Sequence, residues 1–302
     1  MKPHGLDAFF EKLIPKEGKL FYKFIDDAIS EKISIEESQE KPSSEEKDDP
    51  KDMFHYLYQL KDPETGAVAF AREELNGEAV LMQSAGSDTT STCLSSFFFY
   101  ITRFPYAYKK ITTEIRSAFQ NVEEIRTGPK LTACQYLRAC IDESMRIGPP
   151  GTSDLPREVL PGGFTVDGNF FPAGTDIGCP LYPMYHKESH FPDPNVFRPE
   201  RWIVDENTGV TAENVARAKE AFNPFQLGPG VCPGRALAIN EQLIVIARTL
   251  FLMDVKLAPG DDLGAMKPEF GWGRRNKNKF DVKDAYISIR DGPRVQLRKR
   301  VV

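Results

Sequence analysis

The chain has 302 residues, a mass of 34.0 kDa and a formal net charge of −5, enough for one large domain or two ordinary ones. Hydrophobic residues make up 40% of it and charged residues 27%, as in soluble globular proteins. The negative charge argues against a general nucleic-acid binder. Five cysteines, with no CxxC pair and no zinc-like Cys/His spacing, indicate reduced thiols rather than a disulfide framework.

The first seventy residues predict a small helical part. Apolar residues recur at helical spacing over residues 5–34, with an interruption around Pro15, which predicts two helices. Residues 36–52 are rich in Glu, Ser and Lys and contain no aromatic residue, which predicts a solvated acidic linker. A short helix is predicted at Met53–Leu60. We assign residues 1–70 to this part and residues 71–302 to a core domain.

A long helix is predicted from about Ala71 to Arg103. Its middle, Ala85-Gly86-Ser87-Asp88-Thr89-Thr90, suits a helix poorly, because glycine costs about 1 kcal/mol relative to alanine and the hydroxyl and carboxylate groups compete for backbone hydrogen bonds. The segment is either a bend without chemistry or a functional interruption. The surrounding window is the most apolar in the chain, but Asp88 and many hydroxyls argue against a membrane span. The residues after Met1 do not show a basic n-region followed by an apolar h-region, so no signal peptide is expected there.

Two further helices are predicted at Tyr106–Phe119 and Leu131–Ile147. The second carries Glu143 and Arg146, which lie three residues apart and therefore on one helix face. On spacing alone this is an ordinary exposed ion pair, worth a few tenths of a kcal/mol.

The rest of the chain predicts short strands and one more helix. The strand segments are Arg157–Val159, Gly163–Val166, Asn169–Phe171 and Asp176–Leu181. A loop follows from His186 to Trp202, and an amphipathic helix is predicted at Arg235–Phe251. Tyr286–Arg290 and Val295–Leu297 are predicted to pair as a terminal hairpin. The expected fold class is mainly α with small β-sheets.

Residues 225–235 form a loop that is rich in glycine and proline and holds one cysteine, Cys232. Such a loop excludes regular structure and lets the backbone approach another group closely. A thiolate with N–H groups pointing at its sulfur is what a metal-bound cysteine needs. A buried cysteine in the turn before a helix is the other interpretation, because cysteine is often buried.

Four motifs occur in one order: Ala85–Thr90, Glu143–Arg146, Phe197–Trp202 and Phe225–Gly234. This order, with the Pro172–Thr175 turn and the helix after the cysteine, resembles the cytochrome P450 haem-thiolate monooxygenases from about Glu73 to the C-terminus. Leu155-Pro156-Arg157-Glu158-Val159 is similar to fungal members. The resemblance implies a cytochrome P450-like fold that is N-terminally truncated, so that only the C-terminal portion is present.

The resemblance implies that Cys232 is the thiolate ligand of haem iron, in iron protoporphyrin IX. Phe225 is expected to pack near the ligand loop, and Gly228 and Gly234 to let the backbone pass the porphyrin. Arg157 is expected to pair with a haem propionate, which suits its guanidinium fork.

Two catalytic residues and a scaffold network are also implied. Asp88 and Thr89 are expected to relay protons to dioxygen where the long helix opens above the iron. Glu143, Arg146 and Arg201 are expected to form a buried charge network that locks the helix to the loop region.

Two features depart from the family pattern. Gly230 stands where the family usually has a basic residue that holds a propionate, so weaker haem retention is expected. The chain also begins late, because only residues 5–60 precede the long helix. The family has a membrane anchor, several helices, a strand-rich region and a Trp/Arg haem contact there. The resemblance implies an endoplasmic reticulum location, facing the cytosol, for a full-length form, and a cytoplasmic one otherwise.

The implied activity is that of a haem-dependent monooxygenase, which inserts one oxygen atom of O₂ into a small apolar organic substrate, with a role in secondary-metabolite biosynthesis. Electrons are expected from an NADPH-cytochrome P450 reductase. Expected substrate contacts are Met82, Ala85, Gly151 and Thr152. Two alternatives remain: a truncated relative without turnover, and a cofactor-free helical interaction domain.

Overall fold

The computed structural model describes residues 13–39 and 51–300. The chain divides into two compact units, Met1–Ala85 and Gly86–Val302, at a point inside one long helix. The core domain was predicted to begin at residue 71. Within the described ranges, no helix combines the length and the apolar composition that crossing a membrane requires.

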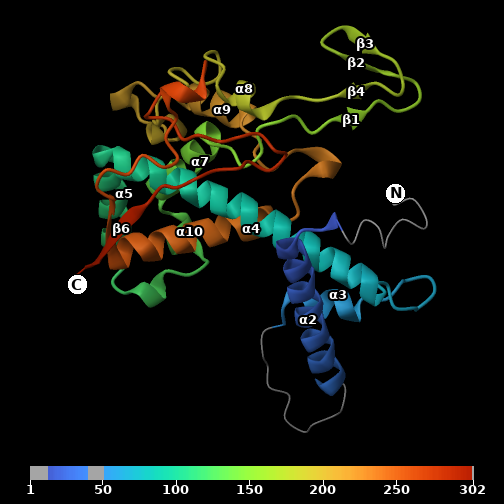
Figure 1. Ribbon diagram of the computed structural model, residues 1–302. Helices are drawn as coiled ribbons and strands as arrows, with labels where there is room; N and C mark the ends of the chain where they lie inside the picture. The colour runs from blue at the N-terminus through green and yellow to red at the C-terminus, as the bar shows by residue number, and fades with distance from the viewer. Residues whose placement is uncertain (1–12, 40–50, 301–302) are drawn as a thin grey trace. The chain divides into compact units, whose positions relative to one another are not determined.

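The smaller unit contains α2 (Lys16–Gln39), α3 (Met53–Gln59) and the start of α4 (Arg72–Arg103) (Figure 1). Polar contacts join these helices: Glu36 Oε2 lies 2.7 Å from His55 Nδ1, and Arg72 Nη2 donates to Asp26 at 3.0 Å. The prediction that the acidic linker begins at residue 36 is wrong, because α2 runs on to Gln39 and Glu36 is buried. Residues 5–12 and 40–50 of the predicted elements lie outside the described residues.

The larger unit is organised around four helices: the rest of α4, α5 (Pro105–Ala118), α7 (Gln135–Ile147) and α10 (Arg235–Leu252). Their apolar faces bury one continuous core, which includes Phe97, Tyr100, Ile111, Ile115, Leu137, Ile141, Ile246 and Leu250. The helices predicted near 71–103 and 235–251 are confirmed.

The predicted helix at 131–147 is two helices, α6 (Pro129–Thr132) and α7. The carboxylate of Glu114, on α5, accepts hydrogen bonds from the N–H groups of Tyr136 and Leu137, both at 2.8 Å. A negative charge at a helix N-terminus is stabilising, so α5 supports the start of α7.

Three two-stranded antiparallel sheets complete the fold. They are β1 (Arg157–Glu158) with β4 (Asp176–Ile177), β2 (Phe164–Val166) with β3 (Asn169–Phe171), and β5 (Met253–Leu257) with β6 (Val295–Lys299). The strands β1 to β4 form an arm that extends away from the helices of this unit (Figure 1).

The predicted terminal hairpin is wrong. Val295–Lys299 pairs with Met253–Leu257 instead. Ser288, in the other predicted strand, donates its N–H to Pro150 O at 2.7 Å and its hydroxyl to Pro149 O at 2.8 Å. The segment is therefore bonded to the loop after α7 and unavailable to β6.

Most of the remaining elements belong to the segment that connects β4 to α10. They are α8 (Leu181–Tyr185), α9 (Ala212–Ala221) and the 3₁₀ turns η2 (Pro199–Trp202), η3 (Glu206–Thr208) and η4 (Gly228–Gly230), with η1 (Val122–Glu124) and η5 (Pro268–Phe270) elsewhere. Leu181, Tyr185, Phe191 and Trp202 form a second, smaller core. The expectation of a mainly α fold with small sheets is confirmed.

Candidate functional site

The Cys232 loop, residues 225–234, contains η4 and leads into α10, and it presents an exposed thiol. The N–H of Cys232 donates to Phe225 O at 2.8 Å, and the ring of Phe225 packs against the larger core. Gly228 has a φ of 68°, a left-handed conformation that favours glycine. A Cβ built on Gly234 would lie 3.8 Å from the Cys232 sulfur. The loop is therefore tied at its base and holds the sulfur outward.

The five cysteines differ in exposure. Cys93, Cys134 and Cys140 are buried, whereas Cys179 and Cys232 are exposed. Burial raises the pKa of the Cys93 thiol to about 12 and that of Cys134 to about 11. Cys232 stands in the turn before a helix, as one interpretation had it, but it is not a buried structural cysteine.

Arg157 is brought to the Cys232 loop from β1. Its Nη1 donates to the carbonyls of Leu155 and Pro156, both at 3.0 Å, and its Nη2 lies against Gly230. An exposed thiol on the loop and a guanidinium beside it from β1 form a donor set that suits an iron porphyrin, because sulfur binds the metal and the fork binds a carboxylate. The residues present therefore fit haem.

Glu143, Arg146 and Arg201 meet in the interior at exposed fractions of 0%, 0% and 5%. Arg146 donates Nε and Nη2 to the two carboxylate oxygens of Glu143, both at 2.9 Å, and Arg201 Nε donates to Oε1 at 3.0 Å. The prediction from spacing alone, an exposed Glu143–Arg146 ion pair, is wrong, because both side chains are fully buried. Together with Trp202, these three side chains are called the Glu143 network below.

Two further donors to Glu143 were not predicted from the sequence. Trp202 Nε1 donates to Oε2 at 3.0 Å and the backbone N–H of Arg198 to Oε1 at 2.9 Å. The Phe197–Trp202 motif was the available signal, since both donors lie within it. Burial alone would raise the pKa of Glu143, but Arg146, Arg201 and the backbone hydrogen bond from Arg198 outweigh it and hold the pKa below its usual value. The carboxylate is therefore charged and fully bonded.

Asp88 and Thr89 lie on α4, which continues without a break through Gly86. Asp88 is exposed and Thr89 half-buried. The neighbouring hydroxyls bond within the helix: Ser91 Oγ donates to Ser87 O at 2.6 Å and Thr92 Oγ1 to Asp88 O at 2.8 Å. These hydroxyls were expected to compete for backbone hydrogen bonds. They donate instead to carbonyls of the preceding turn, and the helix continues.

The substrate-contact candidates are placed on two elements. Met82 and Ala85 lie on α4. Gly151 and Thr152 lie in the loop after α7, where a Cβ on Gly151 would be 3.8 Å from Tyr286 O, and Thr152 O accepts from Tyr182 N at 3.1 Å. The segment around Tyr286, which sequence reasoning assigned to a hairpin, therefore belongs beside this loop.

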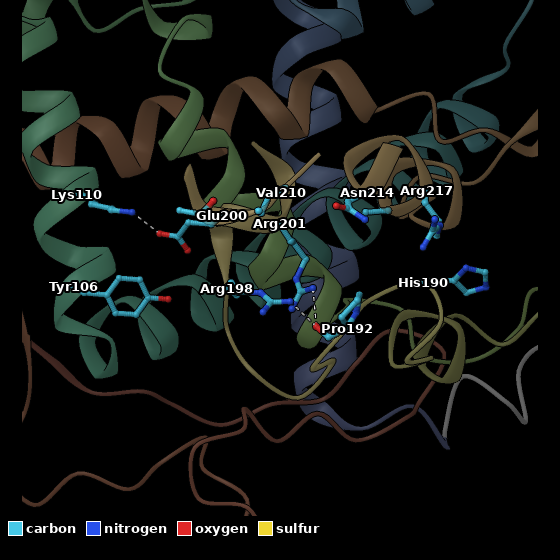
Figure 2. Close-up of a pocket in the computed structure, with 13 residues that line it drawn as sticks. Tyr106, Lys110, His190, Pro192, Arg198, Glu200, Arg201, Val210, Asn214 and Arg217 are labelled. Carbon is cyan, nitrogen blue, oxygen red and sulfur yellow. Dashed lines mark hydrogen bonds and ion pairs between the residues drawn. The ribbon is translucent and has the colours of Figure 1, made fainter. Parts of the chain in front are cut away.

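A pocket of about 540 Å³ is lined in part by Arg201 of the Glu143 network. Figure 2 shows Arg201 and Arg198 near its centre, Lys110 beside Glu200, and Arg217 and His190 at another edge. Its cations are paired nearby: Lys110 with Glu200 at 2.7 Å and Arg217 with Glu213 at 2.9 Å. Of the predicted site residues, Arg201 lines this pocket.

Comparisons with known proteins agree on one family. The family model described as "Cytochrome P450" matches residues 2–279. A cytochrome P450 monooxygenase of Gibberella zeae is 36% identical over 282 residues, which cover 93% of this chain and 61% of that protein. The cytochrome P450 monooxygenase fscF of Fusarium equiseti is 38% identical over 286 residues, 94% of this chain and 52% of that protein.

A crystal structure of a cytochrome P450, CYP102L1, superposes with a TM-score of 0.68 at 21% identity and covers 92% of this chain and 56% of that chain; this likeness supports the fold. The protein belongs to the cytochrome P450 family. It spans between 52% and 61% of the length of the two fungal relatives.

Proposed function

We propose that the protein is a haem-thiolate monooxygenase that inserts one oxygen atom of O₂ into a small apolar organic substrate, in fungal secondary metabolism, with electrons from an NADPH-cytochrome P450 reductase. The observation that carries the proposal is the exposed Cys232 thiol, on a loop tied down by its bond to Phe225 O. Family membership supports it.

Each group of residues has a task in this proposal. Cys232 would hold the haem iron, and Arg157 a carboxylate of the porphyrin. Haem, when bound, supplies the activation of O₂ that amino-acid side chains lack. The Glu143 network bonds α7 to η2. Asp88 and Thr89 hold and pass a proton at the carboxylate and hydroxyl oxygens.

The test is the absorption spectrum of the purified, haem-reconstituted protein after reduction under carbon monoxide. A red-shifted Soret band is expected from thiolate ligation, and Cys232→Ala should abolish it. Cys179→Ala, which removes the other exposed thiol, should keep it. Protein that stays colourless after reconstitution would instead favour a relative without turnover, or a cofactor-free domain.

Thr89→Ala separates the proton role from haem binding. We expect this variant to keep the thiolate spectrum but to consume more O₂ and NADPH per product formed, because the hydroxyl that holds the proton is gone. Thr113→Ala, at an exposed threonine of α5, is the matched control. Unchanged coupling in Thr89→Ala would refute the proton assignment alone.

A further inference from the structure

A side chain at position 230 would displace the exposed guanidinium of Arg157 from its present position. A Cβ built on Gly230 lies 2.6 Å from Nη2 of Arg157, 3.6 Å from its Cζ and 3.7 Å from its Nε. Close-packed protein atoms do not approach to the first of these distances without a shift. The guanidinium therefore stands where any other residue at position 230 would carry its side chain.

The backbone does not account for the glycine. Gly228, two residues earlier, has a φ of 68°, but Gly230 lies outside the left-handed region, so other residues can adopt its conformation. The three atoms nearest to the built Cβ all belong to Arg157. What a side chain at position 230 would disturb is the guanidinium.

The guanidinium is held in this position by the two residues that precede β1. Arg157 Nη1 donates to Leu155 O and Pro156 O, both at 3.0 Å. These acceptors are neutral carbonyls, which leave the positive charge unbalanced, and the remaining donors Nη2 and Nε lie nearest to the loop. The planar guanidinium can donate two parallel N–H···O bonds from Nη2 and Nε to a carboxylate.

We propose that Gly230 is a positioning residue, whose missing side chain lets the Arg157 guanidinium dock on the Cys232 loop and bind a carboxylate side chain of the porphyrin there. The inference rests on the proposed function, because it takes the ligand to be haem. It revises the expectation that glycine at position 230 leaves a charged contact missing, since the cation reaches this place from β1.

The test is a double-mutant cycle on haem loss, measured as transfer from the ferric holoprotein to excess apomyoglobin. Gly230→Ala and Arg157→Gln should each accelerate loss by about three- to tenfold, the effect of weakening one partly exposed charged contact. The double variant should be no faster than the faster single variant, because all remove the same contact. With haem dimethyl ester, which has no free carboxylate, the four proteins should lose the ligand at equal rates.

Gly77→Ala is the matched control, because a Cβ there meets nothing within 4 Å, and haem loss should not change. Wild-type rates in Gly230→Ala, or rates that multiply in the double variant, would overturn the inference and leave haem binding intact. A wild-type chain that takes up no haem would overturn the proposed function, and with it the ligand of this site.

The docking itself has a readout in the ligand-free protein. Nitrogen relaxation of the Arg157 Nε–Hε group should report greater mobility in Gly230→Ala than in wild type or Gly77→Ala. Equal mobility in all three proteins would mean that Gly230 does not seat the guanidinium, and the inference would fail whatever the haem measurement gave.

Discussion

The Glu143 network and the Cys232 loop hold their functional groups in opposite surroundings. Glu143 has no exposed surface and accepts five hydrogen bonds, from Arg146, Arg201, Trp202 and the backbone of Arg198. Cys232 is exposed, and its backbone N–H rather than its sulfur ties the loop. The first region is suited to maintaining the fold and the second to meeting a ligand, so substitutions in the two should fail in different assays.

The largest loss of stability is expected from Arg146→Met. The change leaves the buried Glu143 carboxylate without its bidentate partner, which costs about 3–5 kcal/mol. It also leaves Tyr185 O and Pro194 O without their donor. Urea unfolding followed by circular dichroism measures the loss. Arg217→Met removes an exposed pair with Glu213 and should cost less than about 1 kcal/mol. Equal losses of stability in Arg146→Met and Arg217→Met would contradict the assignment of the Glu143 network to maintaining the fold.

A pH effect is expected at His186, beside the network. Burial and the cation of Lys279 lower the pKa of His186 to about 3, so the folded protein keeps it neutral while the unfolded chain protonates it below about pH 6.5. The unfolded state then binds more protons, and stability falls as the pH drops, by about 1–2 kcal/mol between pH 6.5 and 5.

His186→Phe should remove most of this slope, because phenylalanine can keep the stack on Tyr182, where the ring centroids are 4.1 Å apart. Urea midpoints at several pH values measure it. His190→Phe, at the pocket edge, is the control. If His186→Phe keeps the wild-type slope, another group causes the dependence.

Trp202→Phe probes one donor of the network. The substitution keeps a ring against Phe222, at 4.9 Å between centroids, but removes the N–H that reaches Glu143 Oε2. We expect a loss of about 1–2 kcal/mol in the free energy of unfolding, as for a hydrogen bond to a buried charged group. Trp272→Phe, at a side chain that is 92% exposed, should stay within about 0.5 kcal/mol of wild type.

The smallest effect on stability is expected from Cys232→Ala. In the ligand-free protein its unfolding free energy should stay within about 0.5 kcal/mol of wild type, because an exposed side chain is removed. Cys140→Ser places a hydroxyl in the core and should cost about 1–3 kcal/mol. A large loss for Cys232→Ala would show that the thiol also supports the fold.

The sequence predicted the elements whose signals are local. The apolar periodicity of α4 and α10 and the strand and turn pattern of β2 and β3 were sufficient to find them. The terminal hairpin failed because the turn signal at residues 291–293 is local, whereas β6 pairs with a strand about forty residues earlier. Helix α9 was missed, since its short polar segment carries only a few apolar residues.

The sequence identified the motif residues of the site but not the contacts that these residues make. The order of the four motifs along the chain pointed to Cys232 and to the three charged residues Glu143, Arg146 and Arg201. Sequence could not show that Trp202 donates to Glu143, or that Arg157 stands over Gly230, because both contacts join segments that are far apart in sequence. The assigned roles of Asp88 and Thr89 stay predictions.

The unequal exposure of the cysteines makes the ligand loop accessible to chemical footprinting. An alkylating reagent reaches Cys179 and Cys232, while the three core thiols are shielded. In a Cys179→Ser background Cys232 is the one exposed thiol among the four remaining cysteines. The stoichiometry of modification, read by intact-protein mass spectrometry, then reports how much of a preparation has its loop covered, without reference to colour or turnover.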